Sequence, residues 1–182
     1  YSAKIKNICT NIINSKGIVL IYSNYIDSGV IPIALALEEI GFTRHNTSNK
    51  TLFKNAPTDP IDAISFKPKD STNTFNPAKY VIISGDKILS PNNRQDVISL
   101  TNEDNINGEK IKVVIITRAG SEGLDFKNIR QVHIFEPWYN VNRLEQIIGR
   151  AVRNYSHFDL PEAKRNTTIY QYVNLSDNKD VE

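Results

Sequence analysis

The sequence has 182 residues, 40% of them hydrophobic and 23% charged, and a formal net charge of +2. That length allows one domain with a real hydrophobic core, while the small net charge neither favours nor excludes a nucleic-acid partner. The single cysteine, Cys9, excludes an intrachain disulfide, and the apolar runs are too short to cross a bilayer.

Helices and strands are predicted to alternate along the chain. Helical spacing predicts a helix over residues 3–17 that ends at Gly17, and a second over 27–42. Later helices are predicted over 90–102, beginning at Ser90, and over 140–153. Apolar runs predict strands over 17–23, 79–84, 110–117, 132–136 and 167–175. Because parallel strands need crossover connections, this order predicts an α/β fold with a mostly parallel sheet.

Residues 43–77 interrupt this alternation. The segment has little periodicity and contains four of the eight prolines. We interpret it as a long irregular insertion within the domain and not as a domain boundary.

The loop "TRAGSEGLDF", residues 117–126, follows a predicted strand. In parallel α/β sheets, ligands bind beyond the carboxyl ends of the strands. Two glycines in four residues permit either close approach to a ligand or simply a tight turn. The loop matches neither a Gly-x-Gly-x-x-Gly fingerprint nor a P-loop, so both interpretations stay open.

The helix "NRLEQIIGRAVR" carries a polar stripe. At about 100° per residue, four side chains share roughly a quarter of the circumference: Arg143, Gln146, Arg150 and Arg153. A separate apolar face contains Leu144, Ile147, Ile148, Ala151 and Val152. The stripe has no carboxylate, and the interior Gly149 costs about 1 kcal/mol relative to alanine. An anion site and a solvated basic face therefore remain alternatives on spacing alone.

Together, "TRAGSEGLDF" and "QIIGRAVR" resemble motifs V and VI of superfamily 2 helicases and translocases. "VLIYSNY" resembles motif IV of that superfamily, and "ISGD" resembles the strand-end element that follows it. The run "VHIFEPWYN", with "RAVRNYSH" and "LP" after it, is similar to a narrower group from large cytoplasmic DNA viruses. This group comprises the poxvirus-like nucleoside triphosphate phosphohydrolase I and early transcription factor ATPases. The resemblance covers essentially residues 1–182, as a C-terminal, second RecA-like domain with a sheet of five to six strands.

The resemblance implies a role for each matching residue. Arg150 and Arg153 are implied to be catalytic arginine fingers on the β- and γ-phosphates of ATP, with Gln146 beside the phosphate or the attacking water. The implied nucleotide-binding residues are Glu122, Gly123 and Asp125, the last of them near the ribose hydroxyls. The implied nucleic-acid-binding residues are Ser23, Asn24, Gly85, Thr117 and Arg118. Trp138 and Tyr139 are expected either to stack on a base or to fill the core.

The sequence contains no P-loop and no acidic Mg²⁺-binding motif. The resemblance therefore implies that ATP and Mg²⁺ are held mainly by an N-terminal RecA-like domain outside this sequence. The absence of methionine agrees with a piece of a longer chain, and we expect the piece alone to be inactive. The implied partners are nucleic acid, with DNA favoured over RNA, that N-terminal domain, and a viral RNA polymerase. The implied location is the host cytoplasm or the virion, with no membrane association.

Two other classes of protein fit the sequence less well. A non-catalytic RecA-like module that binds nucleic acid or protein is disfavoured, because it has no need for paired arginines on one stripe. A flavodoxin-like or hydrolase domain is disfavoured, because the sequence shows no pairing of a nucleophile with a base. The three histidines show no metal-ligand spacing, so no metal site is predicted.

Overall fold

The computed structural model describes residues 2–46, 51–55, 57–70, 75–121, 123–137 and 141–173. Its centre is a six-stranded parallel sheet in the order β2-β3-β4-β1-β5-β6. The strands are β1 (Ile18–Tyr22), β2 (Thr43–Arg44), β3 (Lys79–Ile83), β4 (Val113–Ile116), β5 (Ile129–Ile134) and β6 (Thr168–Gln171). The helices are α1 (Ala3–Ile13), α2 (Ile31–Glu39), α3 (Asn93–Leu100), α4 (Arg118–Ser121) and α5 (Val141–Ala151). Short helical turns are η1 (Ile26–Val30), η2 (Glu103–Asn105) and η3 (Glu162–Lys164).

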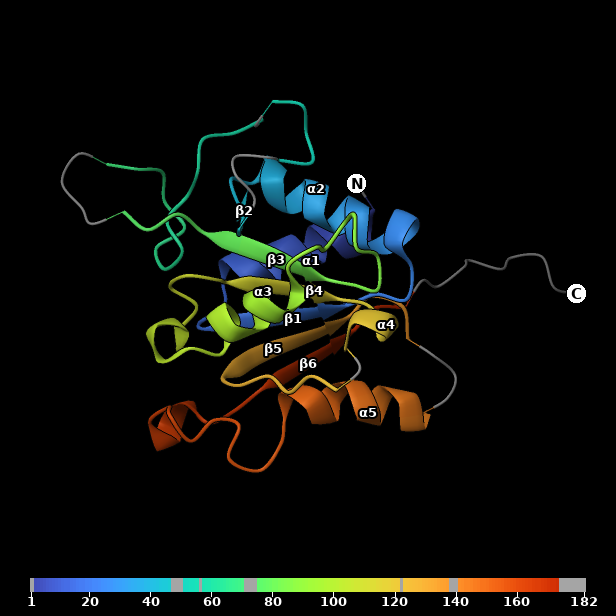
Figure 1. The fold of residues 1–182 in the computed structure, drawn as a ribbon. Helices are drawn as coiled ribbons and strands as arrows, with labels where there is room; N and C mark the ends of the chain where they lie inside the picture. The colour runs from blue at the N-terminus through green and yellow to red at the C-terminus, as the bar shows by residue number, and fades with distance from the viewer. Residues whose placement is uncertain are drawn as a thin grey trace, which may run out of the picture.

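Helices cover both faces of the sheet (Figure 1). Because successive strand residues point to opposite faces, Val19 and Ile21 of β1 pack in one hydrophobic cluster with α1 and α2. Leu20 and Tyr22 pack in the other cluster, with α5. Every residue of β1 and β4 is buried, as expected for central strands of a parallel sheet. The predicted α/β class and helix-flanked parallel sheet are confirmed.

The sixth strand, β2, lies at the start of the segment that was predicted to be irregular. Thr43 and Arg44 pair in parallel with β3, so the proposed boundary at residue 43 was wrong. A strand of two polar residues shows no apolar alternation, so the sequence pattern does not predict it. The described residues after β2 contain isolated bridges from Ile61 to Pro68 and from Asp62 to Pro77.

Several helix boundaries also differ from the prediction: α2 is shorter than the predicted 27–42, α5 ends at Ala151 and not at residue 153, and α1 and α3 differ for reasons that their side chains show. Helix α1 ends before Asn14, whose side-chain amide donates to the Thr10 carbonyl oxygen at 2.9 Å, and not at Gly17. Helix α3 begins three residues after Ser90, because the Ser90 hydroxyl contacts the Ser84 hydroxyl at 2.7 Å instead of capping the helix. Across the described ranges, no helix is long and apolar enough to cross a membrane.

Candidate functional site

The carboxyl ends of β3, β4 and β1 lie side by side, and α4 lies beside them (Figure 1). We call this end of the strands the carboxyl edge of the sheet. A shallow depression of about 320 Å³ lies there, and its lining includes Asn24, Gly85, Thr117 and Arg118. These are four of the five residues predicted to bind nucleic acid. The parallel topology thus gathers residues from three distant loops onto one surface.

Ser23, the fifth predicted residue, lies beneath this surface. Its side chain is fully buried, and its Oγ lies 3.0 Å from Oε1 of Glu136. The other Glu136 oxygen accepts the Asn24 backbone N–H at 2.9 Å. A Cβ on Gly29 would lie 1.9 Å from Ser23 Oγ, so glycine is required for this packing. Ser23 and Glu136 thus fix the loop that presents Asn24.

Glu136 was not among the predicted site residues. Its carboxylate contacts Ser23 and Asn24, which precede it by 113 and 112 positions in the chain. No local sequence pattern reveals contacts at that separation. The available signal was its place in "VHIFE", at the carboxyl end of a strand, where ligand-facing residues of such folds occur.

The loop after β4 begins with one helical turn, α4 (Arg118–Ser121), which the sequence did not predict. Thr117 Oγ1 accepts the Gly120 backbone N–H at 3.3 Å, and Thr117 is otherwise buried. A Cβ on Gly120 would lie 2.2 Å from the Ile83 carbonyl oxygen. This glycine therefore lets α4 sit directly against the end of β3 and positions Arg118.

The arginines of α5 face the loops at the same edge. Arg150 Nη1 donates to the Leu124 carbonyl oxygen at 3.1 Å, and the Phe126 backbone N–H donates to the Arg150 carbonyl at 3.1 Å. Arg153 lies just beyond the helix and forms a 2.7 Å ion pair with Asp125. The two segments identified from the sequence, 117–126 and 146–153, are therefore in direct contact.

The opposite face of α5 is largely as predicted. Leu144, Ile147 and Ala151 are buried. Val152 is 45% exposed, so its assignment to the apolar face was wrong. Val152 is the first residue after the helix, which ends at Ala151, and its backbone N–H still donates to the Ile148 carbonyl oxygen at 2.9 Å. Beside the stripe, no atom lies within 4 Å of where a Gly149 Cβ would be, so the surface there is open.

The segment after α5 is anchored to the start of β5, which fixes Arg153. The Ser156 backbone N–H donates to the Arg153 carbonyl at 3.0 Å, and Asn128 donates its N–H to the Ser156 carbonyl at 2.8 Å. His157 Nε2 lies 2.7 Å from the Ile129 carbonyl oxygen. Arg153 therefore starts from a fixed backbone while its side chain stays exposed.

The Arg153–Asp125 ion pair is suited to exchange. Both side chains are more than half exposed, 58% and 57% respectively. Exposed ion pairs contribute about 0–1 kcal/mol, whereas a phosphate offers a guanidinium a bidentate, multiply charged acceptor. An incoming phosphate can thus displace Asp125 from Arg153 at little cost.

A hydrogen-bonded link joins the arginine stripe to the depression. Arg143 Nη2 donates to Oδ1 of Asn24 at 2.9 Å. The Tyr22 hydroxyl donates to the same oxygen at 2.9 Å. Within the described ranges, Nδ2 of Asn24 is buried without a hydrogen-bond partner, and the residue forms part of the lining of the depression.

The remaining predicted site residues are placed less fully. Gln146, on α5, and Gly123, in the loop after α4, are both exposed. Glu122, Trp138 and Tyr139 lie outside the described residues.

Comparison with known proteins gives one family match and several viral relatives. A sequence profile of the helicase conserved C-terminal domain matches residues 3–155. A mimivirus protein named "Putative ATP-dependent RNA helicase" is 33% identical over 98% of the chain. A termination factor NPH-I homolog of African swine fever virus is 32% identical over 98% of the chain. An early transcription factor large subunit homolog of the same virus is 30% identical over 97%. The chain spans 30%, 26% and 15% of these three proteins, respectively.

Proposed function

This chain belongs to the helicase conserved C-terminal domain family, and from that premise we propose that it is the second RecA-like half of an ATP-dependent nucleic-acid translocase. The preceding half, in the same polypeptide, would hold ATP and Mg²⁺ with a P-loop and an acidic motif. The names of the viral relatives support a role in viral transcription. We propose that the protein acts in the host cytoplasm, beside a viral RNA polymerase.

One observation carries this proposal. Arg150 and Arg153 lie together at the edge where parallel α/β sheets bind ligands, next to the open surface at Gly149. Arginine forks match phosphate oxygens and stay protonated. An arginine supplied to a transferring phosphoryl group accelerates hydrolysis by about 10³–10⁵-fold. Arg153 would leave Asp125 for the γ-phosphate, and Asp125 would then be available to the ribose hydroxyls.

The depression is proposed to hold the nucleic-acid backbone. Arg118 supplies charge, and the side chains of Asn24 and Thr117 supply polar groups of the kind that contact phosphates without reading sequence. Arg143 on α5 donates a hydrogen bond to Asn24. A shift of α5 on ATP hydrolysis would therefore move the loop after β1, which is proposed to contact the nucleic acid. We propose that the preferred nucleic acid is DNA.

The experiment is an ATPase assay on the polypeptide of the complete reading frame, with single-stranded DNA, duplex DNA or RNA as cofactor. The proposal expects stimulation by nucleic acid, strongest with DNA, and its loss in Arg150→Ala. The matched control is Glu145→Ala, an exposed residue of the same helix that lies off the stripe. Nucleic-acid binding without any ATP turnover would instead identify a non-catalytic module.

A further inference from the structure

A second cavity lies where the chain enters β1, β4 and β5. These are the amino-terminal ends of the strands, whereas α4 lies at their carboxyl ends (Figure 1). The cavity encloses about 650 Å³, between the loops that lead into β1, β4 and β5, the turn η3 and part of segment 43–77. Nothing in the proposed motor mechanism uses it. Its volume falls within the roughly 300–1,000 Å³ typical of small-ligand sites.

The lining of this cavity is strongly basic. Lys16, Lys112, Arg130 and Lys164 line it, against the single carboxylate of Glu109. Four cations against one carboxylate leave an excess of three positive charges. The Glu109 carboxylate already accepts the backbone and side-chain N–H groups of Asn107, at 2.9 and 2.7 Å.

Lys112 is the most unusual of these residues, because it is a buried cation. The residue is 1% exposed, and no carboxylate of the described chain lies within 4.0 Å of it. Its Nζ lies 5.2 Å from the centre of the Phe66 ring. Burial lowers the pKa of Lys112 to about 8, against the opposing pull of Glu109 and Asp62. The Phe66 ring at this distance offers a cation–π contact but no negative charge. Burying a charge without an anionic partner is costly, so an anion beside Lys112 would be stabilising.

Two further groups at the cavity lack charge compensation or a partner. The Ser15 hydroxyl is buried, the residue being 6% exposed, and it has no hydrogen-bond partner within the described ranges. Arg130 is held by Asn166, whose backbone carbonyl accepts from Nε at 3.0 Å and whose Oδ1 accepts from Nη2 at 2.8 Å. Both acceptors are neutral, so they orient the guanidinium without neutralising it.

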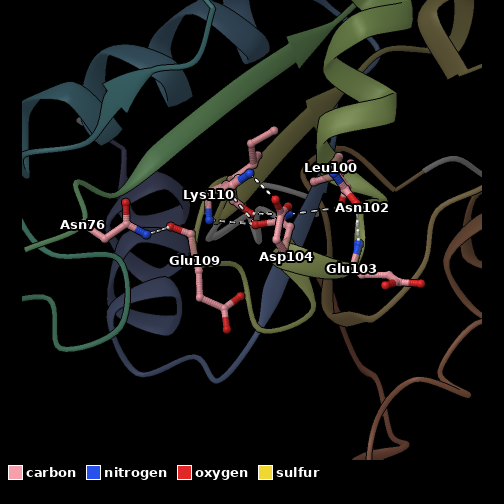
Figure 2. Close-up of polar contacts among 9 residues, drawn as sticks. Asn76, Leu100, Asn102, Glu103, Asp104, Glu109 and Lys110 are labelled. Atoms are coloured by element: carbon pink, nitrogen blue, oxygen red, sulfur yellow. Dashed lines mark hydrogen bonds and ion pairs between the residues drawn. The ribbon is translucent and has the colours of Figure 1, made fainter. Parts of the chain in front are cut away.

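The loop that delivers Glu109 and Lys112 is rigidly built. Asn105 is fully buried, and its side chain bonds the carbonyls of Leu100 and Ile111 and the N–H groups of Lys110 and Ile111. Figure 2 shows this loop, with the Glu109 side chain directed away from the ion pair between Lys110 and Asp104. The cavity wall is therefore formed before any ligand arrives.

We propose that this cavity is a binding site for a phosphate-bearing ligand, with Lys112 and Arg130 as its fixed anchors and Lys16 and Lys164 as exposed cations at its rim. Phosphate suits the set because it carries more than one charge and offers oxygens in several directions. Lysines bind it as point charges, Arg130 as a planar fork, and Ser15 as a neutral donor. The phosphate comes either from a small phosphorylated molecule or from a nucleic-acid backbone.

The test is titration calorimetry of this 182-residue chain with inorganic tripolyphosphate, a short oligothymidylate and a polyglutamate peptide. Losing one rim cation in Lys164→Ala should weaken tripolyphosphate binding about fivefold. Lys112→Met, which keeps the volume of the buried stem, should weaken it at least tenfold. Lys6→Ala, an exposed lysine on α1, is the charge-matched control and should have no effect.

The oligonucleotide distinguishes the two sources. Weaker oligothymidylate binding in Lys164→Ala identifies a nucleic-acid backbone, and binding that is insensitive to this variant identifies a small phosphorylated molecule. The proposal is overturned if tripolyphosphate does not bind, or if Arg153→Ala and not Lys164→Ala removes its binding. It is also overturned if polyglutamate binds as tightly as tripolyphosphate, since the site would then recognise acidic protein segments. Because Lys164 is exposed, its variant tests the site even if Lys112→Met fails to fold.

Discussion

Replacing Arg153 by alanine should abolish ATP turnover while leaving the fold and the nucleic-acid affinity nearly unchanged. In the structure the side chain makes one exposed ion pair, with Asp125, so its loss should cost about 0–1 kcal/mol of the free energy of unfolding. Loss of an arginine finger should lower kcat by about 10³-fold or more, which is roughly 4 kcal/mol of transition-state stabilisation. The loss of transition-state stabilisation should thus be several times larger than the loss of unfolding free energy.

The assay is steady-state ATP hydrolysis by the complete polypeptide at saturating DNA, with thermal unfolding and DNA binding measured in parallel. Arg153→Lys keeps the charge but loses the fork, and should recover only a small part of the rate. Glu145→Ala, from the exposed face of α5, should behave as the unmodified protein. Near-normal turnover in Arg153→Ala would refute the finger assignment, and a large loss of stability would mean that the ion pair is structural.

Three more outcomes are expected from particular contacts. Gly120→Ala should lower the free energy of unfolding by about 1–3 kcal/mol, measured by denaturant titration, because the new Cβ would lie 2.2 Å from the Ile83 carbonyl; an unchanged midpoint would mean that α4 moves freely. Glu136→Gln should weaken DNA binding in a polarisation assay, because an amide has one acceptor oxygen in place of the two that now hold the loop after β1. Unaltered affinity would mean that this loop does not take part in DNA binding. Burial lowers the pKa of His133 from 6.5 to about 4, so the unfolded chain takes up a proton first as pH falls. Stability should therefore drop by about 3 kcal/mol between pH 6.5 and 4. His133→Gln should lose this part of the acid sensitivity in urea titrations across that range, and an equal pH dependence in both proteins would contradict it.

The sequence predicted the features that depend on local periodicity. The apolar runs located five of the six strands, and the helical repeat placed Arg150 on a polar stripe opposite Leu144 and Ile147. The contact between that stripe and the loop at Asp125 came from a resemblance to a known family, since no spacing rule joins them.

The features that the sequence missed depend on contacts between distant segments. Glu136 holds Ser23 across 113 residues, and its side chain alone shows no sign of that role. Lys112 reads as an ordinary strand-end residue, and its burial becomes apparent only when Phe66 of segment 43–77 lies over it. The two-residue strand β2 was missed because it is too short and too polar to show a period.

We propose that the carboxyl edge of the sheet contains two separate functions, phosphate chemistry at Arg153 and nucleic-acid binding at Arg118. They are separated by measuring ATP turnover of the complete polypeptide against DNA concentration for the unmodified protein, Arg118→Ala and Arg153→Ala. Arg118→Ala should raise the DNA concentration needed for half-maximal turnover but reach the same plateau. Arg153→Ala should lose the plateau with DNA affinity intact. If Arg118→Ala instead lowered the plateau, or Arg153→Ala weakened DNA binding to the same degree as Arg118→Ala, the division of the edge into these two functions would be contradicted.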